Sequence, residues 1–76
     1  MPQIFLHNGI PVTGVQAELA FQRWYLSLAT EGLIAEPLRN ALTASNLFAS
    51  ARIRSDNEWG RYARGLLARA CIEVQQ

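Results

Sequence analysis

The chain has 76 residues, of which 50% are hydrophobic and 17% are charged, and its formal net charge is +1. This apolar content excludes intrinsic disorder, and the lack of an apolar run of about 18–20 residues argues against membrane insertion. A chain of this length makes one domain, residues 1–76, which buries only roughly 60% of its unfolded surface, so a partner subunit would help to stabilise it.

The N-terminal segment, about residues 3–13, predicts a β-hairpin. Asn8 and Gly9 form the preferred pair for a two-residue type I′ turn, and apolar residues flank them on both sides. This turn places Leu6 opposite Pro11 in a non-hydrogen-bonded pair. The missing N–H of the proline is therefore not needed there.

A helix is expected to follow the hairpin directly. Thr13 and Gln16 have the spacing of a capping box, and apolar residues at helical spacing continue to Thr30. Gly32 then supplies the stop, because glycine suits the left-handed position after a helix.

Self-association is predicted from apolar residues that a monomer does not easily cover. Ile4 and Leu6 line a second apolar face of the hairpin, and the edge of the strand that carries them has no proline to block it. In the first helix, Val15, Leu19 and Leu26 form a stripe separate from the main one. We therefore expect a homodimer through Ile4, Leu6, Leu19 and Leu26.

A second helix is predicted to start at Glu36-Pro37, since proline is favoured in the first turn, and to run to about Arg54. Asn46 could divide it. In that case the two halves would resemble a helix-turn-helix in outline, although the usual turn glycine is missing and one continuous helix explains the apolar spacing equally well.

A third helix is predicted to begin with a capping box from Ser55 to Glu58 and to end at about Val74. The expected fold class is therefore mainly α, at the margin of α+β: a three-helix domain with an N-terminal hairpin. Trp24, Tyr25 and the Trp59–Tyr62 pair adjoin apolar stripes, which favours core packing, with anchoring of an interface as the alternative.

The basic residues are the main functional signal. All seven are arginines, and five of them fall in one short stretch near the C-terminus: Arg52, Arg54, Arg61, Arg64 and Arg69. Arginine grips carboxylates, phosphates and aromatic faces with a planar five-donor fork, so this cluster predicts a surface for a partner.

The sequence contains no combination of residues that predicts catalysis. His7 is the only histidine and has no acid at a suitable spacing, Cys71 is the only cysteine, and together they cannot make an ordinary zinc site. We expect no enzyme, cofactor, metal or small-molecule substrate. A lone thiol and the absence of a signal peptide pattern suggest the cytoplasm.

These features together predict a non-enzymatic protein–protein interaction module. It would be a small regulator or inhibitor, of the kind carried by mobile elements, that occupies a surface of a larger protein. The alternative is a small dimeric DNA-binding transcriptional regulator that uses the same basic face. The C-terminal half has a net charge of only +3, however, which supplies few phosphate contacts.

Overall fold

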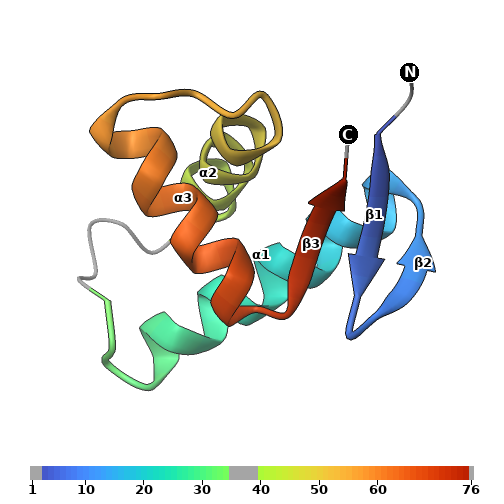
Figure 1. Cartoon of the computed structure of the whole chain (residues 1–76). Helices are drawn as coiled ribbons and strands as arrows, with labels where there is room; N and C mark the ends of the chain where they lie inside the picture. Colours follow the sequence, from blue (N-terminus) through green and yellow to red (C-terminus); the bar gives the residue numbers. More distant parts are fainter. Residues whose placement is uncertain (1–2, 35–39, 76) are drawn as a thin grey trace.

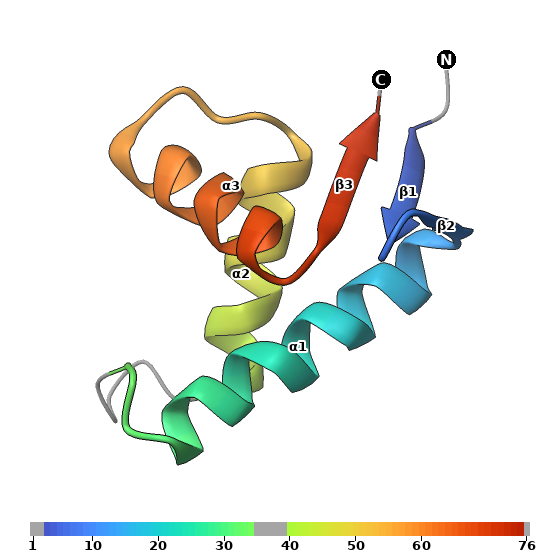
Figure 2. The ribbon, with the colours of Figure 1, turned by 60° about the horizontal axis from the view of Figure 1, so that its bottom comes forward.

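A computed structural model describes residues 3–34 and 40–75 (Figure 1). It has three helices and a three-stranded antiparallel sheet, which confirms the predicted mainly helical fold with an N-terminal hairpin. In chain order the elements are β1 (Ile4–His7), β2 (Ile10–Val12), α1 (Gly14–Thr30), α2 (Ala41–Arg52), α3 (Glu58–Arg69) and β3 (Ile72–Gln75). The sheet lies over the first turns of α1, while α2 and α3 lie beside the later turns of the same helix (Figure 2).

The hairpin forms as predicted. Asn8 and Gly9 both have positive φ, 55° and 79°, as a type I′ turn requires. Leu6 lies opposite Pro11, so the proline takes the position where no N–H is needed.

The strand order is β2-β1-β3, so β1 is the central strand. The prediction that the edge of residues 3–6 stays open is wrong, because β3 pairs with it from Ile4↔Gln75 to His7↔Ile72. The chain thus supplies its own third strand. An isolated hairpin is only marginally stable, and a third strand with a helix-covered face corrects this.

The prediction of a helix reaching Val74 is also wrong. Helix α3 ends at Arg69, Cys71 takes a left-handed φ of 61°, and the chain continues as β3. The reason is burial. In an extended α3 Ile72 would fall off the apolar stripe, whereas in β3 it faces the helices and is only 4% exposed.

Side-chain caps fix where the helices begin. The capping box of α1 is confirmed, with Gln16 N donating to Thr13 Oγ1 at 3.0 Å and Thr13 N donating to Gln16 Oε1 at 2.9 Å. The cap of α3 is Asn57, which accepts from Gly60 N, and not Ser55 as predicted. Asparagine and serine are about equally favoured as N-caps, so residue type alone does not separate Asn57 from Ser55.

Helix α2 begins at Ala41, after an Asn40 cap that accepts from Thr43 N. The start predicted at Glu36-Pro37 lies outside the described residues. The helix continues through Asn46 to Arg52, so the helix-turn-helix with a break at Asn46 is not formed.

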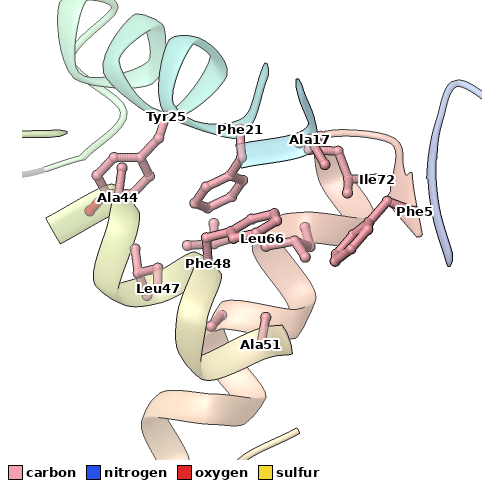
Figure 3. Packing of buried hydrophobic residues seen from close by; sticks show 13 residues of the cluster. Phe5, Ala17, Phe21, Tyr25, Ala44, Leu47, Phe48, Ala51, Leu66 and Ile72 are labelled. Atoms are coloured by element: carbon pink, nitrogen blue, oxygen red, sulfur yellow. The ribbon is translucent and has the colours of Figure 1, made fainter. Parts of the chain in front are cut away.

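The core is an aromatic cluster where the sheet, α1 and α2 meet (Figure 3). The Phe48 ring lies 6.0 Å from that of Phe5 and 6.2 Å from that of Phe21. Tyr25 extends the cluster along α1, with its ring 6.0 Å from Phe21. Each phenylalanine of the trio comes from a different element, so the cluster joins the sheet, α1 and α2, and α3 adds Ala63, Leu66 and Leu67 to the same core.

Tyr25 is fully buried, and its hydroxyl has no hydrogen-bond partner among the described residues. Burial raises the pKa of this hydroxyl above 10.0, and Tyr62 adds to the shift. The folded protein therefore holds this proton more tightly than the unfolded chain does. The associated stability is present below about pH 10 and is lost as the pH rises further.

We expect Tyr25→Phe to leave the free energy of unfolding at pH 7 unchanged or to increase it, because the change removes an unpaired buried polar group. Between about pH 9 and about pH 11 the variant should lose less stability than the unaltered protein. Urea titrations across this range measure both effects, and with no lysine in the chain few other groups titrate there. Equal alkaline losses in the two proteins would contradict the role of Tyr25.

Candidate partner-binding groove

Arg54 lies at the end of α2 in a conformation that normally belongs to glycine. Its N–H donates to Ala51 O, and the next N–H, of Ser55, donates to Ser50 O, which is a Schellman motif with Arg54 at the left-handed position, φ 55°. Helix α1 ends in the same kind of turn, but with Gly32, φ 74°. For a residue with a Cβ this backbone is less favourable by roughly 1–2 kcal/mol.

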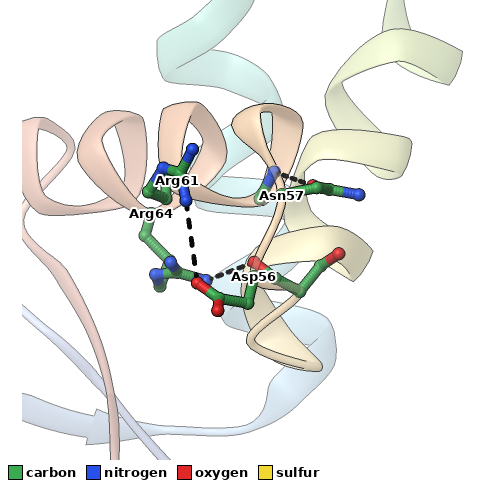
Figure 4. Close-up of polar contacts among 6 residues, drawn as sticks. Asp56, Asn57, Arg61 and Arg64 are labelled. Atoms are coloured by element: carbon green, nitrogen blue, oxygen red, sulfur yellow. Dashed lines mark hydrogen bonds and ion pairs between the residues drawn. The ribbon is translucent and has the colours of Figure 1, made fainter.

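Arg64 lies on α3 and is held in place by the loop that joins α2 to α3. Its Nη1 donates to Ser55 O at 2.7 Å (Figure 4). The loop can fold this close to α3 because residue 60 is glycine: a Cβ there would lie 2.7 Å from the Ser55 carbonyl carbon. Arg64 is therefore half-buried and oriented by the protein itself.

Arg54 and Arg64 line one groove, bounded on its other side by β3. Its volume is about 180 Å³. The lining residues are Ala51, Arg54, Arg64, Leu67, Ala68, Ile72, Glu73 and Val74. In Figure 1, β3 lies between β1 and α3, so the groove runs along the side of β3 that faces away from the hairpin. We call this hollow the α3–β3 groove.

Two arginines, Arg54 and Arg64, and one acid, Glu73, line the groove, so its lining carries a net positive charge. Among the described residues, neither Arg54 nor Arg64 forms a salt bridge; the one salt bridge in that part of the chain joins Arg61 Nη1 to Asp56 Oδ1 at 3.7 Å (Figure 4). Both partners of that pair are well exposed, so it contributes little to stability. The carboxylate of Glu73 accepts instead from Gln75 Nε2 at 3.3 Å.

The remaining predicted arginines lie elsewhere. Arg52 donates from Nε to Gln3 Oε1 at 2.9 Å, and its guanidinium lies 5.2 Å from the centre of the Phe5 ring. Arg69 lies over Trp24 of α1 at 5.9 Å from the ring centre. The five arginines thus point in several directions, and the structure brings only Arg54 and Arg64 together in one groove.

The residues predicted for self-association do not share one hollow. Ile4 is 52% exposed, and alternation along β1 puts it with Leu6 on the face of the sheet away from Phe5. Leu19 is 47% exposed and lines a hollow with residues of β1, β2 and α1. Leu26 is half-buried further along α1. Self-association through these residues stays a prediction, with the β1 edge no longer open to it.

The aromatic residues divide between core and surface. Tyr25 is buried in the core, and Trp24 is half-buried and packs against it. Trp59 and Tyr62 are 38% and 42% exposed, their rings are 5.9 Å apart, and Trp59 Nε1 donates to Asn46 Oδ1 at 3.1 Å. The prediction of a core position is wrong for this pair.

His7 and Cys71 come close in the fold without sharing a site. The residue after His7, Asn8, donates its N–H to Cys71 O at 2.9 Å. However, His7 lines a hollow with α1, whereas Cys71 lines a different one beside Gly9. Within residues 3–34 and 40–75 no three metal-binding side chains gather, and no helix is both long and apolar enough to span a bilayer.

Comparisons of the chain with protein-family models, with curated proteins and with solved structures found no match. Sequence reasoning identified the two arginines of the α3–β3 groove but missed the wall that β3 contributes. The available signal was the alternation Ile72-Glu73-Val74, which is typical of a strand and was included in the third helix.

Proposed function

We propose that the protein is a non-enzymatic binding module that engages a partner protein through the α3–β3 groove, with Arg54 and Arg64 as charged anchors. The observation that carries this proposal is the left-handed backbone of Arg54. Glycine would relieve that strain, as Gly32 does in α1, and strained residues concentrate where a side chain serves binding. Arg64 supports it because it lines the same groove and its guanidinium is fixed by a hydrogen bond to Ser55 O.

We infer that the module acts in the cytoplasm as a small regulator or inhibitor, such as those carried by mobile elements, by occupying a surface of a larger protein. Its small size and the exposed Trp59–Tyr62 pair support this inference, because aromatic and arginine side chains dominate binding hot spots. We also propose a homodimer, for which the exposed Ile4 and Leu19 are the candidate contacts.

The arrangement of the arginines favours a protein over a nucleic acid. A duplex is held by several cations that reach phosphates along one surface. Here Arg52 is engaged with Gln3 and Phe5, and Arg69 with Trp24, so these two point away from the groove. DNA binding remains the alternative outcome of the test.

The test is quantitative affinity capture from the native host, comparing the unaltered protein with Arg54→Gly and with Arg64→Gln. We expect at least one captured protein to lose about tenfold or more in affinity with each variant, since a charge-assisted hydrogen bond is worth roughly 1.5–3 kcal/mol. Arg23→Gln is the matched control, because it removes one exposed charge from α1.

Circular dichroism of each variant shows whether the fold is kept. Identical captures by all four proteins would refute the proposal. Anisotropy of a labelled mixed-sequence duplex at about 50 and about 200 mM salt tests the alternative, since phosphate binding weakens steeply over that range. Salt-sensitive binding that all three variants weaken alike would favour nucleic acid.

A further inference from the structure

The backbone of β3 offers hydrogen-bonding groups toward the groove. In an antiparallel pair, residues alternate between those that bond to the neighbouring strand and those that point away from it. Asn8 N donates to Cys71 O, and the register then makes Leu6↔Glu73 and Ile4↔Gln75 the bonded pairs. The N–H and C=O groups of the two alternate residues, Ile72 and Val74, therefore point away from β1.

These outward groups lie at a sheet edge that no other described strand covers, since β3 is terminal in the order β2-β1-β3. Ile72 and Val74 also line the α3–β3 groove. An open edge of this kind is a template for a further strand, and extended peptides bind to such edges by main-chain hydrogen bonds. The other edge strand, β2, contains Pro11, which weakens it as a template.

We propose that the partner of the α3–β3 groove is an extended, acidic peptide segment that adds to β3 as a fourth strand. This inference rests on the proposed function and specifies the chemistry of the partner. Main-chain bonds to Ile72 and Val74 hold the segment in place. An acidic side chain on its helix-facing side reaches the guanidinium groups of Arg54 and Arg64.

Charge complementarity selects an acidic segment over a neutral one. Arg54 and Arg64 both line the groove and neither forms a salt bridge with a described residue, so a carboxylate entering it meets two cations. One acid, Glu73, also lines the groove, but the two arginines keep a net positive charge there. The Glu73 carboxylate accepts from Gln75 Nε2.

The size of the groove favours side chains over a free small molecule. Its volume of about 180 Å³ lies below the roughly 300–1,000 Å³ usual for ligand pockets. The groove is continuous with the strand edge, where side chains of a bound strand point alternately toward and away from α3. One or two side chains of a peptide would thus enter it while the main chain stays on β3.

The experiment begins with a display library of random ten-residue peptides, selected on the immobilised full-length protein. We expect the enriched peptides to carry acidic residues and to lose about tenfold or more in affinity for Arg54→Gly and for Arg64→Gln, but not for Arg23→Gln. The strongest binder is then synthesised and added to the unaltered protein. Amide hydrogen exchange is measured by NMR with and without this peptide.

On addition of the peptide, exchange at Ile72 and Val74 should slow by at least about tenfold, because their N–H groups become bonded. The amides of Glu73 and Gln75 already bond to β1 and serve as the internal control. Protection at Ile72 and Val74 that depends on protein concentration without peptide would overturn the proposal, since a second copy would then occupy the edge.

The two proposals fail in different ways. Peptides that depend on the arginines but leave exchange at Ile72 and Val74 unchanged overturn strand addition while the binding role of the groove stands. A selection that yields no peptide sensitive to Arg54 or Arg64 overturns the peptide inference. The capture experiment with the same variants then decides the proposed function by itself.

Discussion

Phe48→Ala should lower the free energy of unfolding by about 3–5 kcal/mol, the usual range for deleting a buried aromatic ring. Phe48 is 1% exposed and packs between Phe5 of β1 and Phe21 of α1. Its removal leaves a cavity where the sheet and two helices meet, and none of these elements can close it without losing contacts elsewhere. Urea denaturation followed by circular dichroism measures the change.

Leu42→Ala is the matched control, since it also truncates a large apolar side chain of α2. Leu42 is 80% exposed, so this change should alter stability by no more than about 0.5 kcal/mol. For a chain of this length total stability is on the order of 4–11 kcal/mol, so Phe48→Ala should remove a large part of it. Similar losses in the two variants would contradict the central place of Phe48.

Gly60→Ala is expected to destabilise the protein by about 1–3 kcal/mol, although alanine is the better helix former. Gly60 lies in the first turn of α3 against the loop that precedes it. An added Cβ would meet the carbonyl oxygen of Ser55 and come within 2.8 Å of the Ser55 Cβ. The Ser55 atoms that the Cβ would meet are largely backbone. Ser55 is held by Arg64 and by the Schellman turn, so it cannot move freely.

Gly65→Ala provides the comparison within the same helix. Nothing lies within 4 Å of its added Cβ, so only helix propensity changes, and we expect a gain of roughly 0.5–1 kcal/mol. Thermal unfolding of both variants measures the expected loss of stability in Gly60→Ala and the expected gain in Gly65→Ala. A gain in stability from Gly60→Ala would show that the loop does not pack against α3 as described. Gly60→Ala should also weaken peptide binding, because it displaces the loop that carries Ser55, and Ser55 orients Arg64.

Two errors of sequence interpretation, the long third helix and the open edge of β1, have one physical cause at the end of α3. Gly32 marked the end of α1 because glycine is the usual left-handed residue there. Helices α2 and α3 end in left-handed turns too, but with Arg54 and Cys71, which carry a Cβ and give no such signal. The predicted third helix was therefore extended through the residues that form β3.

The candidate site was predictable in its charges and not in its shape. The clustering of arginines in the sequence identified Arg54 and Arg64, but also Arg52 and Arg69, which the fold directs toward aromatic rings. The second wall of the groove comes from β3, and β3 exists only where β1 offers it a partner. Residues distant in sequence supply the two walls, so no local pattern could describe the groove.

The sequence by itself determined the features that depend on neighbouring residues: the Asn8-Gly9 turn, the Thr13 capping box and the apolar face of α1. Each follows from backbone preference or helical spacing within a few residues. Only the tertiary structure decided that the C-terminal residues pair with β1. That choice depends on burying Ile72 against the helices and bonding a strand edge from the other end of the chain, which local preference does not encode.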